Sequence, residues 1–206
     1  MEKGKFITLD GIDGAGKTTQ LAVIRDWFEQ QNLPVYFTRE PGGTIVGEKL
    51  RKIMLDKHTH ISVMTETLLM FAARQQHLEE IILPNLEKGV HVVSDRFTDA
   101  TFAYQGAGRG VSLEKIECLE RLVQEDFCPD LTILLDVPLS VSLSRIEQTR
   151  DKDRFEQENM AFFERVRSAY LTRAANAPSR YVVVNNICDK MEVKTEIEQI
   201  LTRLFA

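Results

Sequence analysis

Short apolar runs alternate along the chain with longer stretches whose apolar residues recur at three- and four-residue spacing. The short runs are rich in Val, Ile, Leu and Phe, which is typical of strands buried on both faces. They predict strands at 6–10, 35–38, 90–94, 131–137 and 181–184. The longer stretches predict helices at 19–31, 45–55, 65–86, 113–125, 139–148, 159–175 and 191–205.

Regular alternation of strands and helices predicts a doubly wound α/β fold with parallel strands and right-handed crossovers. The 206 residues contain no internal repeat and no low-complexity linker, so we expect one domain over 1–206. Ligands of such folds bind at the carboxyl ends of the strands. The residues that follow each strand are therefore the first candidates for a site.

Composition narrows the class of protein. The net charge of −5 argues against a general nucleic-acid binder, and no apolar run is long enough to span a membrane. The chain begins at Met1 and runs straight into a strand, which leaves no room for a signal peptide. Cys118, Cys128 and Cys188 lack C-x-x-C spacing, so we expect reduced, partly buried thiols in a cytoplasmic protein.

A phosphate-binding motif follows the first strand. The pattern G-x-x-x-x-G-K-[ST] is matched by Gly11, Ile12, Asp13, Gly14, Ala15, Gly16, Lys17 and Thr18. Glycines allow successive backbone N–H groups to point at a polyphosphate, and the following helix adds its positive end. Lys17 is expected to reach the β- and γ-phosphates, and the Thr18 hydroxyl to bind Mg²⁺. The strand before the motif and the helix after it are in the required order.

Charged residues follow the second and third strands. Arg39 and Glu40 enter a Pro-Gly-Gly turn, where they are either site residues or solvated surface charges. Asp95 and Arg96 end the third strand. An acidic residue there commonly orders Mg²⁺ and its waters, and an arginine beside it suits a second phosphate. The alternative is a helix-capping aspartate with a surface arginine.

Two further segments carry groups suited to a nucleobase. Thr101 and Gln105 share one helical face with Tyr104 adjacent, and Phe71 lies three residues before Arg74. An amide can bond a base edge and an aromatic ring can cover its face. Phe71 alone is more typical of a core, whereas Phe71 paired with Arg74 near a pocket could stack on a base. The glycine-rich segment 106–110 is expected to be a loop.

The stretch 145–158 is dense in charge, and 149–153 has no apolar residue. It is either a solvated loop or a short mobile lid whose arginines close over the transferring phosphates.

These motifs, in this order, resemble bacterial thymidylate kinase over nearly the whole chain. The matching segments are residues 9–19, 38–44, 95–97, 103–106, 129–132 and 153–158. Arg-Glu-Pro-Gly-Gly and Ala-Tyr-Gln-Gly are more specific than the P-loop. The resemblance implies a five-stranded P-loop kinase fold with helices on both faces, a lid, phosphorylation of dTMP by ATP with Mg²⁺, and a homodimer.

The resemblance also implies roles for individual residues. For ATP it implies that residues 11–19 of the P-loop, Thr19 included, bind the phosphates and that Arg145 stacks on adenine. Arg150 and Arg154 would be the lid arginines. Thr18 and Asp95 would serve Mg²⁺, and Asp13 and Glu40 would lie near the sugar 3′-hydroxyl and the metal. For dTMP it implies phosphate contacts from Arg39, Arg51 and Arg96, stacking by Phe71, and contacts from Arg74, Thr101, Tyr104 and Gln105. Lys17, Arg96, Arg150 and Asp13 would be the catalytic set.

Two features depart from many relatives. Phe71 and Arg74 are three residues apart rather than four, so Met70 is the other candidate for stacking on the base. The variable P-loop positions carry no positive charge, which places more weight on Arg150.

Two other functions remain open at this point. One is a kinase for another nucleoside monophosphate or for a shikimate-like metabolite. The other is a GTPase-type switch, although no Asn in this chain is followed by Lys, as the usual guanine-reading motif requires.

Overall fold

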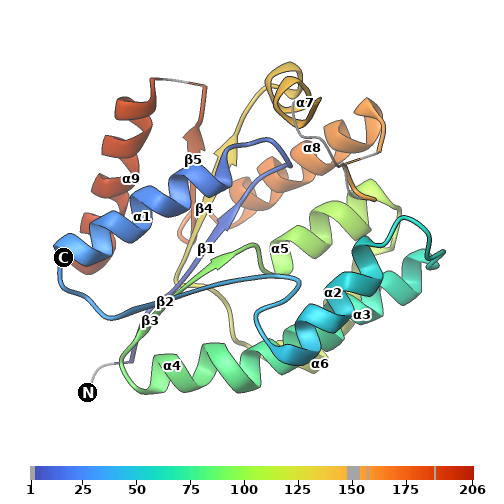
Figure 1. Ribbon diagram of the computed structural model, residues 1–206, viewed down its shortest axis with the longest axis horizontal. Coiled ribbons are helices and arrows are strands. Elements are labelled where there is room, and N and C mark those ends of the chain that lie inside the picture. Colours follow the sequence, from blue (N-terminus) through green and yellow to red (C-terminus); the bar gives the residue numbers. More distant parts are fainter. Residues whose placement is uncertain (1–2, 148–153, 157, 188) are drawn as a thin grey trace.

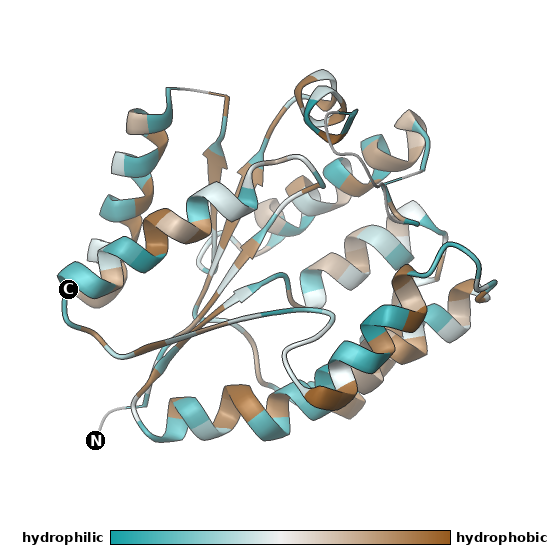
Figure 2. Cartoon of the chain, in the orientation of Figure 1, coloured by the Kyte–Doolittle hydropathy of each residue, from teal (hydrophilic) through white to brown (hydrophobic). Residues whose placement is uncertain are grey.

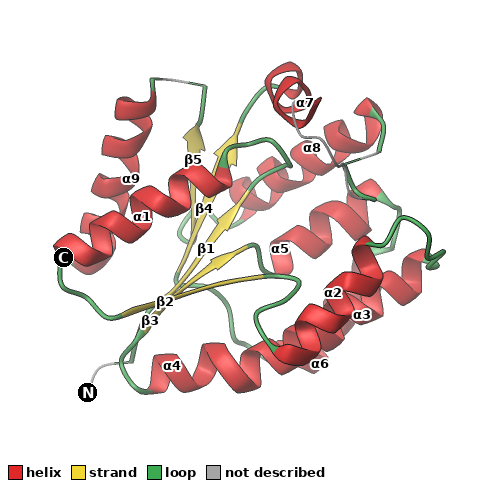
Figure 3. Ribbon diagram, in the orientation of Figure 1, coloured by secondary structure: helices red, strands yellow, loops and turns green. Residues whose placement is uncertain are grey.

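The computed structural model describes residues 3–147, 154–156, 158–187 and 189–206. Its centre is one parallel sheet with strand order β2-β3-β1-β4-β5 (Figure 3). The strands are β1 (Phe6–Asp10), β2 (Val35–Arg39), β3 (His91–Asp95), β4 (Leu131–Asp136) and β5 (Tyr181–Asn185). Because β1 is central, the P-loop that follows it opens at the middle of the sheet's carboxyl edge.

Helices cover both faces of the sheet. Figure 1 shows α1 and α9 on one side and α4, α5 and α8 on the other. The α-helices are α1 (Lys17–Gln30), α2 (Ile45–Leu55), α3 (Val63–His77), α4 (Leu83–Glu87), α5 (Thr98–Thr101), α6 (Leu113–Gln124), α7 (Leu139–Glu147), α8 (Met160–Asn176) and α9 (Lys190–Phe205). Two π-helical segments join them, η1 (Leu78–Ile82) after α3 and η2 (Phe102–Gly108) after α5. The predicted α/β architecture is confirmed.

Hydrophobic residues run along the sheet in Figure 2, and the inner strands are apolar because both of their faces are packed. All five residues of β1 are buried. On one face, Phe205 of α9 packs against Trp27 and Phe28 of α1, with ring centroids 5.4 and 5.5 Å apart. On the other face, Phe97 meets the ring of Phe6 edge-on at 4.9 Å. Burial of several aromatic side chains on each side supplies much of the driving force for folding.

Strand prediction from the sequence was accurate to within one residue at each end. The predicted helix 65–86 differs, since it begins at Val63, where the Ser62 side chain caps it, and passes through η1 into α4. Pro84 in the first turn of α4 lacks an N–H group, which is consistent with a changed hydrogen-bond pattern just before it.

The expectation of a loop at 106–110 is wrong for its first half, because η2 continues to Gly108. Gly106 and Gly108 are needed because neighbouring side chains leave little room for a Cβ atom. A Cβ atom on Gly108 would lie 2.5 Å from Cε2 of Phe162, and one on Gly106 would lie 3.1 Å from Cδ1 of Ile116. Glycine in this segment therefore allows close approach of η2 to α8 and α6.

Cys118 and Cys128 are free and exposed, so the expectation of partial burial is wrong for both. Cys188 lies outside the described residues. Within the described ranges, no helix is long and apolar enough to cross a membrane.

Candidate active site

A cavity of about 460 Å³ opens at the carboxyl edge of the sheet. The P-loop, the ends of β2 and β3, and helices α2, α3, α5 and α7 contribute to its walls, as does η2. This is the size of an ordinary ligand site, and it lies where parallel α/β sheets bind ligands.

The P-loop has the conformation that its glycines predict. Gly14 and Gly16 adopt φ of +75° and +91°, and a Cβ on Gly14 would lie 2.5 Å from the Ser142 carbonyl oxygen. Asp13, Gly14, Gly16, Lys17 and Thr18 line the cavity. Gly11, Ile12, Ala15 and Thr19 do not line it.

Lys17 lies along the P-loop backbone, with Nζ 3.3 Å from the Gly11 carbonyl oxygen. Burial, together with the charge of Arg96, lowers the pKa of the Lys17 amine. Both effects disfavour its charged form, and bound phosphate groups would oppose them. The P-loop is thus built to receive negative charge.

Asp13 connects the P-loop to the end of β3. Its Oδ1 accepts a hydrogen bond from Nη2 of Arg96 at 2.5 Å, and its Oδ2 accepts one from the Tyr104 hydroxyl at 2.8 Å. Burial acts to raise the pKa of the Asp13 carboxyl, but the charges of Arg96 and Lys17 outweigh it and the pKa is lowered. Asp13 is therefore a charged acceptor whose two oxygens already have partners.

Arg96 is held on two sides. Its backbone adopts φ of +70°, which is uncommon for a residue with a side chain. Its Nη1 donates to the Tyr170 hydroxyl at 3.1 Å, and that hydroxyl donates to Oδ1 of Asp10 at 3.0 Å. The guanidinium lies 4.6 Å from the centroid of the Tyr104 ring. These contacts fix a cation at the centre of the cavity wall.

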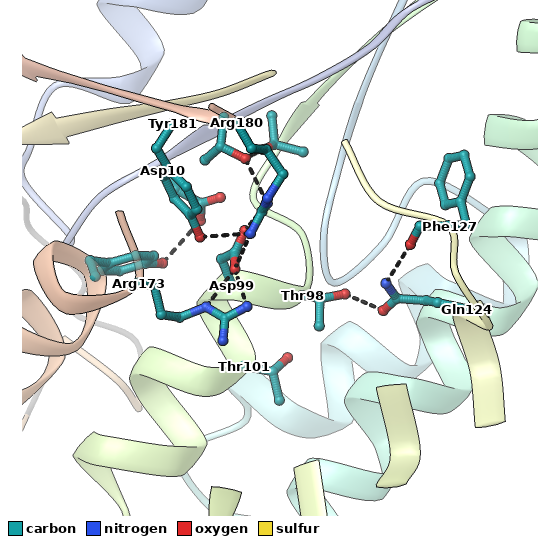
Figure 4. A network of polar contacts seen from close by, with 12 residues as sticks. Asp10, Thr98, Asp99, Thr101, Gln124, Phe127, Arg173, Arg180 and Tyr181 are labelled. Atoms are coloured by element: carbon teal, nitrogen blue, oxygen red, sulfur yellow. Dashed lines mark hydrogen bonds and ion pairs between the residues drawn. The ribbon is translucent and has the colours of Figure 1, made fainter. Parts of the chain in front are cut away.

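A polar network centred on the buried Asp99 is shown in Figure 4. Asp99 accepts hydrogen bonds from Arg173 at 2.6 Å and from Arg180 at 2.6 Å. Burial would raise the pKa of Asp99, but the two arginines outweigh it and lower that pKa. Asp10 has no such partner, and burial together with the charge of Asp99 raises its pKa to about 7.

Arg74 forms the other end of the cavity. Its Nε donates to Oε2 of Glu40 at 2.8 Å, and its Nη2 donates to Oγ1 of Thr101 at 3.0 Å. Arg74 lines the cavity. Its Nη1 atom is buried and has no hydrogen-bond partner among the described residues. A buried donor without a partner indicates an acceptor on a ligand.

Glu40 lines the cavity, and its first oxygen accepts the hydrogen bond from Arg74. Its second oxygen accepts a hydrogen bond from Nδ1 of His77 at 2.9 Å, and His77 shares a further hydrogen bond with Thr38. His77 therefore fixes the Glu40 carboxylate, and the fixed carboxylate orients the Arg74 guanidinium.

Phe71 does not line the cavity, and the expectation that it stacks on the base is not supported by its position. It is 2% exposed and packs with Phe102 and Ile116. The three-residue spacing instead places its ring 4.7 Å from the Arg74 guanidinium. Met70, four residues before Arg74, lines the cavity together with Phe97.

Arg154 is not positioned over the P-loop as a lid arginine would be. Its Nη2 donates to Oε2 of Glu66, and its Nε donates to the Met54 carbonyl oxygen at 2.9 Å. The Oε1 atom of the same buried Glu66 accepts a hydrogen bond from Nε2 of Gln105 at 2.7 Å. Arg154 thus lies on the Arg74 side of the cavity, because a buried carboxylate draws it there.

The remaining predicted arginines have different surroundings. Arg39 and Arg51 line the cavity, but Arg39 pairs in a bidentate manner with Glu48 and is half-exposed. Nη1 of Arg51 donates to the Pro41 carbonyl oxygen at 2.8 Å. Arg145 of α7 donates to the Gly14 carbonyl oxygen at 3.0 Å, which places it on the P-loop side as expected. Arg150 lies outside the described residues.

The residues expected to serve Mg²⁺ are suitable for it. Thr18 and Asp95 both line the cavity. Oδ1 of Asp95 is buried and makes no hydrogen bond to any part of the chain that the structure describes. Mg²⁺ is usually held by one or two protein oxygens with substrate phosphates and water, so this donor pair fits.

Glu66, His77 and Tyr170 are among the residues of the site region that the sequence analysis missed. Glu66 and His77 lie on α3, eight residues before and three residues after Arg74. Their place on the same helix as Arg74 could have drawn attention to both. Tyr170 carried no local signal, because its partners Arg96 and Asp10 are 74 and 160 residues away.

Comparisons with known proteins show which family the chain resembles. The family model described as thymidylate kinase matches residues 9–197. The thymidylate kinase of Neisseria meningitidis serogroup A (strain DSM 15465 / Z2491) is 63% identical over 203 residues, which is 98% of each chain. That of Nitrosomonas europaea is 53% identical over 201 residues, covering 98% of this chain and 94% of the relative.

A solved structure is similar as well. The crystal structure of thymidylate kinase from Ehrlichia chaffeensis has a TM-score of 0.78 and 33% sequence identity, covering 97% of this chain and 99% of that one. The structural similarity thus extends over nearly the whole chain. The chain belongs to the thymidylate kinase family and has the P-loop kinase fold.

Proposed function

We infer that this protein transfers the γ-phosphoryl group of ATP to dTMP, giving ADP and dTDP. The main support for this function is that the cavity has two chemically different ends. A P-loop forms one end, and an apolar wall with the unpartnered donor of Arg74 forms the other. A polyphosphate fits the first end and a nucleobase fits the second, with Arg96 beside the position between them.

The residues of the cavity suit phosphoryl transfer, which depends on position and positive charge more than on covalent chemistry. Lys17 and the P-loop amides would hold the donor phosphates, and Arg96 would hold the acceptor phosphate. Mg²⁺ at Thr18 and Asp95 would neutralise charge on the donor phosphates. The acceptor phosphate is itself the nucleophile, so no strong base is required.

A further cation is assigned to Arg150 from the sequence. The P-loop side chains at positions 12 to 15 are uncharged or negative, and Arg154 is engaged by Glu66. Arg150, in the lid segment 145–158, is therefore our candidate for the arginine that stabilises the transferring group.

The test is a coupled assay of ADP formation from ATP with dTMP, dUMP, dCMP, dGMP or AMP. We expect ADP formation to depend on the acceptor and to be fastest with dTMP. Preference for another acceptor would assign a different monophosphate kinase. ADP formation independent of every acceptor would contradict a kinase of this class.

We propose further that the protein is a homodimer. Exposed apolar side chains lie on three helices that pack side by side, namely Ile45 on α2, Leu68 on α3 and Leu122 on α6. A second copy covering this face would bury them. Sedimentation of the wild type as a dimer, and of Leu68→Arg as a monomer, is the expected result.

The exposed free thiols of Cys118 and Cys128 favour a reducing compartment, and we propose the cytoplasm. With a net charge of −5, we expect neither nucleic acid nor a membrane surface as a partner.

A further inference from the structure

Gln105 presents only one end of its amide to the cavity. It is 1% exposed, lines the cavity, and donates through Nε2 to Oε1 of Glu66 at 2.7 Å. A carboxylate oxygen accepts hydrogen bonds and donates none, so this contact determines which end of the amide faces Glu66. The carbonyl oxygen Oε1 is the end that remains for a ligand.

Glu66 has little freedom to turn. Its side chain is fully buried, and the side chains of Gln105, Arg109 and Arg154 contact it. Oε2 accepts from Arg154, while Oε1 lies 3.1 Å from Nε of Arg109 in addition to its contact with Gln105. Arg109 also pairs with Glu158 at 3.0 Å, so two guanidinium groups face two carboxylates in this cluster. Balanced charge allows a buried carboxylate to remain in one orientation.

The result is a fixed pattern of polar atoms at this end of the cavity. Nη1 of Arg74 is a buried donor without a partner, and Oε1 of Gln105 is an acceptor. A pyrimidine with a 4-oxo group and an N3–H presents an acceptor next to a donor, which matches this pattern. A 4-amino pyrimidine presents the reverse.

We propose that Glu66 is a positioning residue that sets the choice between 4-oxo and 4-amino pyrimidine monophosphates, by fixing the orientation of the Gln105 amide. The proposal rests on the proposed function, because it takes the acceptor to be a pyrimidine nucleotide. Glu66 acts through Gln105 and does not itself line the cavity.

Glu66→Gln tests this role because it reverses the polarity of one contact. The Arg154 guanidinium can only donate and bonds Oε2, so it would hold the carbonyl oxygen of the new amide at that position, whereas Nε of Arg109 makes no hydrogen bond to any residue that the structure describes. The new NH₂ group would then face Gln105, whose amide would turn and present Nε2 to the cavity. Two donors would then face each other in a 4-oxo pyrimidine complex, because N3 of that base carries a hydrogen. In a 4-amino pyrimidine N3 is an acceptor, so the turned amide could donate to it.

The experiment compares kcat/KM for dTMP and dCMP in the wild type, Glu66→Gln and Glu158→Gln. We expect Glu66→Gln to lower the dTMP-to-dCMP ratio by about tenfold or more, because a mismatched hydrogen bond in a buried site is costly. Glu158→Gln makes the same chemical change in the same charge cluster without touching Gln105, and its ratio should equal that of the wild type.

An equal loss of kcat/KM for both acceptors in Glu66→Gln would overturn the proposal, because it would assign Glu66 a purely structural role. So would an equal fall of the ratio in Glu158→Gln. If Glu66→Gln does not fold, Glu66→Asp keeps the charge and withdraws the oxygens by one methylene, which frees the amide to turn. A wild-type ratio in that variant would overturn the proposal too. A wild type inactive with dTMP would instead contradict the proposed function.

Discussion

The hydroxyl group of Tyr170 accepts a hydrogen bond from the Arg96 guanidinium across 3.1 Å, although 74 residues separate the two in the sequence. Tyr170 is 1% exposed on α8, and its hydroxyl donates in turn to Asp10. Arg96 is thereby held from behind, on the side away from the cavity. Its position depends on α8 as well as on the strand that carries it.

Tyr170→Phe should therefore weaken binding of the acceptor. Loss of a hydrogen bond to a charged group corresponds to about 1.5–3 kcal/mol, so we expect KM for dTMP to rise by about tenfold or more, with KM for ATP unchanged. Steady-state kinetics with each substrate varied would measure this. Tyr181→Phe is the matched control, since it removes a buried hydroxyl that accepts a hydrogen bond from Arg180 rather than from Arg96. Equal KM values for dTMP in both variants would refute the role of Tyr170.

Asp10 should make stability depend on pH. Burial and the nearby charge of Asp99 raise its pKa from 3.8 to about 7, so the folded state binds the proton more tightly than the unfolded state. Ionisation of Asp10 thus costs stability increasingly as pH rises from about 4 to about 7, by an order of a few kcal/mol. Asp10→Asn removes this titration. Urea unfolding at intervals between pH 4 and 8 would measure the free energy of unfolding of both proteins. The stability of Asp10→Asn relative to the wild type should increase as pH rises. An unchanged stability difference across this pH range would contradict the assignment.

Arg150→Ala should lower turnover much more than binding. An arginine that stabilises a transferring phosphoryl group is worth ~10³-fold or more in kcat, whereas dTMP is held mainly by other residues. Lys152→Ala removes a positive charge from the same segment and is the control. Both variants require kcat and KM for dTMP under saturating ATP. Wild-type turnover in Arg150→Ala would exclude the catalytic role.

Gly108→Ala should destabilise the fold. The added Cβ would lie 2.5 Å from Cε2 of Phe162 and 3.1 Å from Cγ2 of Val166, so η2 and α8 would have to separate. Overpacking of this kind costs about 1–3 kcal/mol. Gly110 has φ of +80° but no atom within 4 Å of a Cβ, so Gly110→Ala isolates the conformational cost. Chemical denaturation should show the larger loss for Gly108→Ala.

Local patterns predicted the parts of this molecule that depend on local interactions. Strands such as Phe6–Asp10 could be recognised because burial on both faces requires apolar residues throughout. The P-loop could be recognised because its chemistry is continuous in sequence. Glycines 106 and 108 were misinterpreted, since their use depends on α6 and α8 packing against them. Arg154 was misplaced for a similar reason, because the buried charge that attracts it is 88 residues away.

Phe71 shows a different reason for error. Its spacing from Arg74 correctly indicated a shared face, but a ring and a guanidinium on one face can interact with each other instead of with a ligand. Resemblance to relatives suggested the ligand. The structure shows the ring 4.7 Å from the guanidinium, and Met70 in the cavity wall.

The contact between Asp13 and Arg96 links the two substrates thermodynamically. Asp13 belongs to the loop that would hold the donor, and Arg96 to the group that would hold the acceptor. An occupant of one end that changed the energy of this contact would change the affinity of the other end. Such linkage is reciprocal: the factor by which a nonhydrolysable ATP analogue alters the Kd for dTMP equals the factor by which dTMP alters the Kd for the analogue. Through one ion pair, binding of the two nucleotides would become a joint event.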